Sequence, residues 1–175
     1  MLRMPRIAAI VLFALAVPFA AAKEREVAIG LQAAITSIDP HYHNLSPNNS
    51  LLLHIFEPLV LRDSNQKMIP GLAVSWKALD DLTWEFKLRR NVKFHDGTPF
   101  TADDVVFTLQ RAPSVPNSPS SFATFTRPIT EVKVVDPFTI RFSTAAPHVL
   151  LPSDLGAAAV ARDTSESGLR EFLAS

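Results

Sequence analysis

The sequence predicts a mixed α/β fold. Three segments support this prediction: an alternating strand at 82–88, an amphipathic helix at 101–111 and a hairpin at 132–142. Alternating apolar and polar residues give a strand one buried and one solvated face, whereas apolar residues at intervals of three and four give a helix one buried face. Because both periods occur along the chain, we expect helices packed against a sheet.

The segment 82–88 is the clearest strand. Its apolar residues, with polar ones between them, are Leu82, Trp84, Phe86 and Leu88. This pattern predicts one face toward the core and one toward water. The alternation continues at Val92 and Phe94, and Asp96-Gly97 then provides a turn because glycine adopts positive φ easily.

A helix is predicted to begin shortly after this turn. Thr101 is a suitable N-cap, and Asp104 three residues later completes a variant of the capping box. The apolar residues that follow with helical spacing are Ala102, Val105, Val106 and Leu109. Pro113 ends the helix because its ring clashes with the preceding turn.

Several shorter elements complete the expected fold. They are strands at 27–31 and 59–61, a helix at 51–56, and a hairpin formed by 132–135 and 139–142. The alternation also allows a strand at 68–69. Asp136-Pro137 fits the first two positions of a type I turn in that hairpin. The proline-rich segment 112–121 is expected to be a loop. The apolar segment 155–162 fits either a helix or a strand.

Residues 1–22 have the pattern of a signal peptide. Arg3 and Arg6 precede an apolar run, and Ala20 to Ala22 form a small-residue cleavage site. A membrane anchor is the alternative, but the apolar run is shorter than the ~20 residues that a spanning helix needs, and Pro18 interrupts it. We therefore expect cleavage near Ala22 and export to the periplasm.

The composition excludes several classes of protein. The chain has no cysteine, which excludes disulfides, thiol catalysis and a lipidated cysteine anchor. The chain has 17 basic residues (lysine and arginine) and 17 acidic residues (aspartate and glutamate). It therefore lacks the excess of positive charge that is typical of nucleic-acid-binding proteins. The five glycines form no phosphate-binding loop, and no cofactor is predicted.

Motifs along residues 25–155 resemble the family 5 extracellular solute-binding proteins, the peptide- and nickel-type receptors of bacterial ABC importers. The matching motifs, in order, are Ile38-Asp39-Pro40-His41, Phe56-Glu57-Pro58-Leu59, Leu72-Ala73-x-Ser75-Trp76, Trp84-x-Phe86-x-Leu88-Arg89, Val92 to Gly97, Pro99 to Val106 and Val132 to Ile140. Agreement of several ordered motifs over this length makes a chance match implausible.

The resemblance implies a specific architecture. Residues 23–165 would form part of the N-terminal lobe of a type II-like periplasmic binding protein, with a mixed sheet and flanking helices. Residues 166–175 match no landmark of the family. Because members have two lobes, we expect the chain to be incomplete and, by itself, to bind ligand weakly or not at all.

The resemblance also implies a function. Members capture a solute between hinged lobes and deliver it to an ABC permease in the inner membrane. Peptides are the leading ligand class, and the protein is expected to be a monomer. Two alternatives remain open: a secreted hydrolase, and a non-functional fragment of a binding-protein gene.

Two segments are candidates for ligand contact. By the resemblance, residues just after the Asp-Pro-His motif approach the cleft, and the positions that match are Tyr42, His43, Asn44 and Leu45. The second candidate is the segment Ser120 to Phe125, which follows the proline-rich loop where, by the resemblance, family members also line the pocket. Within it, Phe122 and Phe125 would share one face of a helical turn. Core packing explains this pair equally well.

The sequence holds one weak metal pattern and no catalytic motif. Asp39, His41 and His43 have ligand chemistry for zinc, copper or nickel, but we predict no metal site because further paired ligands are absent nearby. Loss of an activity on mutating these residues would support the hydrolase alternative. The acidic pairs Asp80-Asp81 and Asp103-Asp104 are explained by turn and helix-dipole preferences.

Overall fold

A computed structural model describes residues 28–162 of the chain. The predicted signal peptide at 1–22, its cleavage site and the segment 166–175 lie outside the described residues. The chain divides into two units at Gly30, and the described fold belongs to the second unit. Residues 28–31 form no strand, so the strand expected at 27–31 is wrong over its described part. Ile29, in this segment, is exposed.

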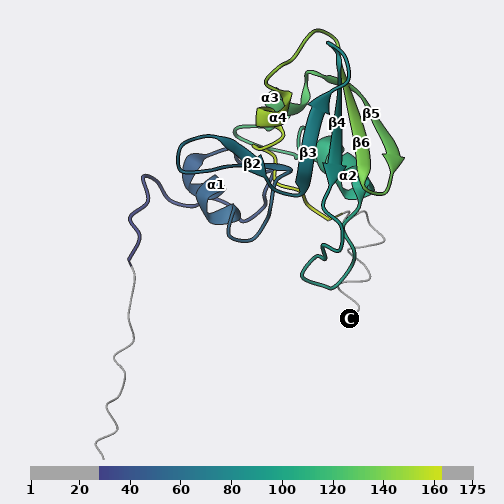
Figure 1. Cartoon of the computed structure of the whole chain (residues 1–175). Coiled ribbons are helices and arrows are strands. Elements are labelled where there is room, and N and C mark those ends of the chain that lie inside the picture. The colour runs from purple at the N-terminus through teal and green to yellow at the C-terminus, as the bar shows by residue number, and fades with distance from the viewer. Residues whose placement is uncertain (1–27, 163–175) are drawn as a thin grey trace, which may run out of the picture. The chain divides into compact units, whose positions relative to one another are not determined.

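The described residues combine helices and strands, which confirms the mixed α/β class. In chain order the elements are α1 (Ser46–Leu52), β1 (Val60–Arg62), β2 (Met68–Pro70), β3 (Ala73–Ala78), β4 (Thr83–Leu88), α2 (Ala102–Arg111), α3 (Ala123–Thr126), β5 (Ile129–Asp136), β6 (Thr139–Thr144) and α4 (Leu151–Asp154). Figure 1 shows their arrangement. The expected strands near 59–61 and 68–69 are β1 and β2.

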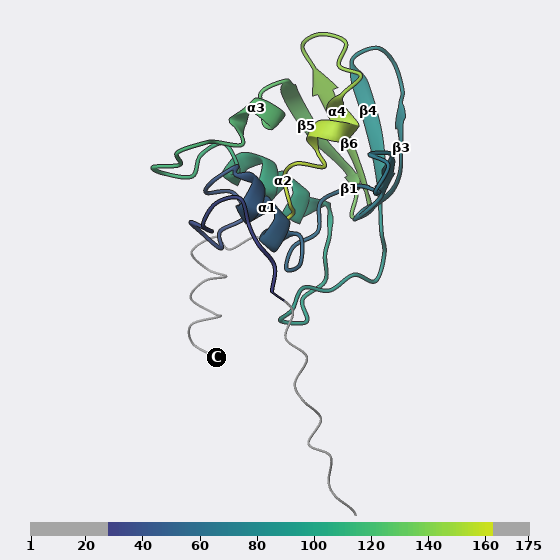
Figure 2. The same ribbon diagram turned by 90° about the vertical axis from the view of Figure 1, so that its left-hand side faces the viewer.

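The main sheet has the strand order β3-β4-β6-β5, and β1 and β2 form a separate two-stranded sheet. Pairing between these strands is antiparallel throughout. The parallel component of the expected mixed sheet therefore occurs, within residues 28–162, only as an isolated bridge between His43 and Ser120. Helix α2 covers one face of the main sheet (Figure 2), and Val105 and Leu109 share the core with Phe86 and Ile140.

The capping prediction for α2 is confirmed. The Thr101 side chain accepts a hydrogen bond from the Asp103 backbone at 3.3 Å, and the Asp104 carboxylate accepts one from the Thr101 backbone at 2.9 Å. The backbone N–H of Ala102 donates to the Pro137 carbonyl at 2.9 Å, which links the start of α2 to the β5–β6 turn. Local capping at Thr101 and a tertiary hydrogen bond at Ala102 therefore both stabilise the start of the helix.

The polar face of β4 is less solvated than predicted. Glu85 is 6 % exposed because it lies opposite Lys77 and Arg141 in the neighbouring strands, and Lys87 approaches the same carboxylate. The hydrogen bond from Arg141, with the charges of Lys87 and Lys77, lowers the pKa of Glu85. Basic side chains thus replace water around a central carboxylate.

Three further expectations need correction. Val92 and Phe94 do not extend β4, because the chain turns at Asn91, which has φ of 60°. The helix expected at 51–56 is α1, which begins at Ser46 after Leu45, a residue that makes no side-chain cap and so gives no start signal. Residues 155–162 form neither helix nor strand, apart from one bridge from Ala159 to Pro58.

Gly71 is required by a close approach of two backbone segments, and Gly71→Ala is expected to destabilise the protein by about 1–3 kcal/mol. A methyl group there would lie 2.5 Å from the Pro58 carbonyl oxygen and 3.0 Å from that of Leu59, neither of which belongs to a flexible side chain. Urea unfolding measures the effect. Gly30→Ala is the control because a methyl group there meets nothing within 4 Å. Equal stability of both variants would contradict the prediction.

Candidate ligand-binding site

The two segments predicted to contact ligand lie side by side. His43 and Ser120 form a parallel bridge, and the Asn44 N–H donates to the Ser120 carbonyl at 3.0 Å. The Ser118 hydroxyl donates to the Tyr42 carbonyl at 2.6 Å. The loop after the Asp-Pro-His motif is therefore held against the proline-rich loop that follows α2.

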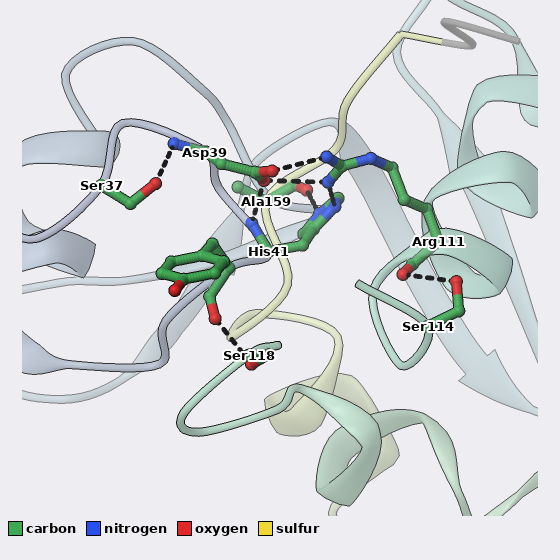
Figure 3. Close-up of polar contacts among 8 residues, drawn as sticks. Ser37, Asp39, His41, Arg111, Ser114, Ser118 and Ala159 are labelled. Carbon is green, nitrogen blue, oxygen red and sulfur yellow. Dashed lines mark hydrogen bonds and ion pairs between the residues drawn. The ribbon is translucent and has the colours of Figure 1, made fainter. Parts of the chain in front are cut away.

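An ion pair fixes the first loop to the end of α2 (Figure 3). The Arg111 guanidinium donates to both carboxylate oxygens of Asp39, at 2.9 and 2.6 Å. The same carboxylate accepts the His41 backbone N–H at 2.9 Å. Burial alone would raise the pKa of Asp39, but these hydrogen bonds and the charge of Arg111 outweigh it and lower that pKa.

His41 is the centre of this arrangement and is fully buried. Its Nδ1 lies 2.8 Å from Arg111 Nη1, and its Nε2 lies 2.8 Å from the Ala159 carbonyl oxygen. Because guanidinium groups only donate and carbonyl oxygens only accept, Nδ1 must be the acceptor and Nε2 must hold the hydrogen. His41 is therefore neutral, and it ties the loop to both α2 and the segment after α4.

Burial, followed by the charge of Arg111, lowers the pKa of His41, although the Ala159 carbonyl and the Asp39 charge oppose the shift. Stability is therefore expected to decrease as the pH falls below about 6.5, the pKa of an unfolded histidine. The unfolded chain binds the proton first, and the loss ends once folded His41 is also protonated. Asp39, whose folded pKa is likewise lowered, adds a second loss below pH of about 3.8.

Urea unfolding at several pH values between 7.5 and 5 checks the first loss. His41→Gln should flatten the slope because the titrating group is gone, whereas Val149→Ala, which changes an exposed residue without a titratable group, should leave it unchanged. A native chain equally stable at pH 7.5 and 5 would contradict the neutral assignment of His41.

The six predicted ligand residues differ in accessibility. Tyr42, His43, Asn44 and Leu45 are half-buried. Phe122 is 1 % exposed and packs with Ala112 and Ala158, and its ring meets His41 edge-on at 6.0 Å. Phe125 is half-buried beside it. Core packing, the alternative for this pair, accounts for Phe122, whereas Phe125 retains an accessible part.

The weak metal pattern has other roles in the structure. Asp39 and His41 are bound to Arg111, and the His43 ring contacts the Thr36 hydroxyl. Within the described residues no three histidine, cysteine or acidic side chains are grouped so that they could hold a metal ion. No helix in the same part of the chain is long and apolar enough to span a membrane.

Sequence reasoning did not identify Arg111 or Ala159 as supports of the site. Arg111 ends a helix, where a basic residue is explained by the helix dipole. Nothing in the sequence indicates that Arg111 pairs with Asp39. The contact of Ala159 is made by its backbone carbonyl, which every residue type has, so the sequence could not indicate it either. The Asp-Pro-His motif was the one signal that pointed to this region.

A cavity of about 540 Å³ lies next to the site. Its lining is mostly apolar, with Phe56, Phe94 and Val160 among the contributors, and Pro40 and Arg111 are shared with the site. None of the six predicted ligand residues lines it. Charged residues, among them Glu57, Lys93 and Arg162, also contribute to its lining.

The comparison with known proteins decides the family. Residues 67–169 match the model for bacterial extracellular solute-binding proteins, family 5. This chain belongs to that family. The family 5 match covers the motifs from β2 to beyond α4, so the resemblance stated above is confirmed. Family 5 members are solute-binding proteins rather than enzymes.

Individual relatives of this chain support the same family. It is 32 % identical over 130 residues to the periplasmic oligopeptide-binding protein OppA of Escherichia coli (strain K12), an alignment of 65 % of this chain and 24 % of the relative. It is 32 % identical over 139 residues to the glutathione-binding protein GsiB of Pectobacterium atrosepticum, covering 79 % and 26 %. The chain thus spans about a quarter of these relatives' lengths.

A solved structure confirms the fold of the family 5 chain. OppA of Burkholderia pseudomallei superimposes with a TM-score of 0.67 at 28 % identity, covering 78 % of this chain and 29 % of that one. The described residues therefore form part of a periplasmic-binding-protein lobe.

Proposed function

We propose that this chain is part of the periplasmic substrate-binding component of an ABC importer. The protein captures peptides or similar small solutes and delivers them to a permease in the inner membrane, and it acts as a monomer. One observation carries the proposal: the segments 42–45 and 118–120, far apart in sequence, are joined by hydrogen bonds.

The relatives support this proposal and its ligand class. Those described above are named for binding oligopeptides and glutathione, which are both peptidic. In such receptors the ligand lies between two lobes that close about a hinge. Tyr42 to Leu45 and the accessible part of Phe125 would form the contribution of this chain to that cleft, and residues of a second lobe would supply the rest.

Two titrations of the 175-residue chain test the proposal. Isothermal titration with trialanine, glutathione and a mixed tetrapeptide pool is expected to show no low-micromolar binding, because one lobe supplies only part of the contacts. Low-micromolar binding would contradict the expected incompleteness of the site.

Nuclear magnetic resonance on the isotope-labelled chain tests the location. At millimolar peptide, shifts are expected at 42–45 and near 118–125. The control is the β5–β6 turn at Asp136 to Thr139, which should not respond. The proposal fails if no resonance of the two segments moves, or if the shifts lie only elsewhere.

A further inference from the structure

One buried asparagine side chain, in α1, has no part in the ligand contacts proposed above. This residue, Asn48, is fully buried. Its Oδ1 accepts the backbone N–H of Thr36 at 3.0 Å, and its Nδ2 donates to the Thr36 hydroxyl at 2.9 Å. Because a backbone N–H can only donate, the orientation of the amide is fixed. Thr36 is therefore held through both its backbone and its side chain.

Thr36 in turn contacts the ring of His43, with 2.8 Å between Oγ1 and Nδ1. The hydroxyl accepts the hydrogen of Asn48 and keeps its own hydrogen for donation. His43 Nδ1 lies within reach of that hydrogen, which favours Nε2 over Nδ1 as the nitrogen that carries the hydrogen of the neutral ring. Asn48 thus occupies one acceptor position of the hydroxyl, which favours donation from Thr36 to His43 Nδ1.

The second ring nitrogen of His43, Nε2, is available to form a hydrogen bond with a ligand. Within residues 28–162 it has no hydrogen-bond partner, and no side-chain nitrogen or oxygen in this part of the chain is both buried and unpaired. Nε2 is therefore accessible to solvent. His41 differs from it, because both of its nitrogens are occupied by Arg111 and Ala159.

We propose that His43 presents its Nε2–H as a donor to a carboxylate or carbonyl oxygen of the ligand, and that Thr36 and Asn48 are positioning residues for this donor. The inference rests on the proposed function for its ligand, but the proton position stands by itself. A hydroxyl fixed by a buried amide holds the ring in advance, so less conformational freedom is lost when ligand binds.

The proton position is tested without ligand. Nitrogen chemical shifts of the His43 ring at pH 8 are expected to show the hydrogen on Nε2. Thr36→Val should give a mixture of the two neutral forms, and Thr36→Ser should restore the native pattern. Thr124→Val, at an exposed position, is the matched control. A hydrogen on Nδ1 in the native chain, or no change in Thr36→Val, would overturn the inference.

The donor role is tested with trialanine and its C-terminal amide at millimolar concentration. The His43 ring resonances are expected to shift with either peptide, and a larger shift with the free acid would identify a carboxylate as the acceptor. Thr36→Val should weaken binding about fivefold, the equivalent of one ordinary hydrogen bond. Thr36→Ser should bind as the native chain does.

The outcomes separate the two proposals. Shifts of Tyr42 and Asn44 without any change at the His43 ring would refute the donor role and leave the proposed function intact. Absence of shifts throughout both segments would contradict the proposed function and the donor role together, while the result for the proton position would remain valid.

Discussion

Phe86→Ala is expected to lower the free energy of unfolding by about 3–5 kcal/mol, the usual cost of deleting a buried aromatic ring. Phe86 is fully buried in β4, a central strand of the main sheet. Its ring stacks on Trp76 with centroids 6.2 Å apart and meets Phe142 edge-on at 5.2 Å. The alanine variant would leave a cavity between β3 and β6. Urea unfolding followed by tryptophan fluorescence measures the loss.

A graded series keeps this prediction testable if the alanine variant does not fold. Phe86→Leu retains most of the apolar volume and is expected to cost about 1–2 kcal/mol. Val149→Ala is the control, because Val149 is 78 % exposed and a surface change there should stay within about 0.5 kcal/mol. An alanine variant at position 86 as stable as this control would show that the ring does not lie in the core.

Arg111→Met is expected to destabilise the protein by about 1–3 kcal/mol and to loosen the candidate site. The change removes the donors to both oxygens of Asp39 and to Nδ1 of His41. Losing one member of a buried pair is costly because the other is left unpaired. Here the side chains of Arg111 and Asp39 are 29 % and 31 % exposed, so water offsets part of that cost.

Hydrogen exchange distinguishes this prediction from a general loss of stability. In Arg111→Met the amide of Asn44, which donates to Ser120, should exchange faster relative to that of Ile140 in the sheet. Arg127→Met is the matched control, since Arg127 is exposed and makes no ion pair within residues 28–162. Uniform acceleration at both amides would mean that Arg111 supports the whole fold rather than the site.

Local signals explain which parts of the fold were predictable. The capping box at Thr101, the alternation in β4 and the turn at Asp136-Pro137 each lie within a few residues, and all three elements occur where expected. Helix α1 was misplaced because Leu45 provides no cap. Strand β3 was not predicted, because its burial depends on β4 rather than on its own pattern.

The sequence by itself determined the family, the fold class and the positions of β4, α2 and the β5–β6 hairpin, because periodicity, caps and turns are encoded in neighbouring residues. Only the tertiary structure decided that Asp39 pairs with Arg111, that His41 is neutral, and that Asn48 holds Thr36 against His43. Long-range pairs such as Asp39 and Arg111 depend on how the sheet and α2 bring remote segments together. The protonation state of His41 depends on such long-range contacts, so the local sequence pattern cannot specify it.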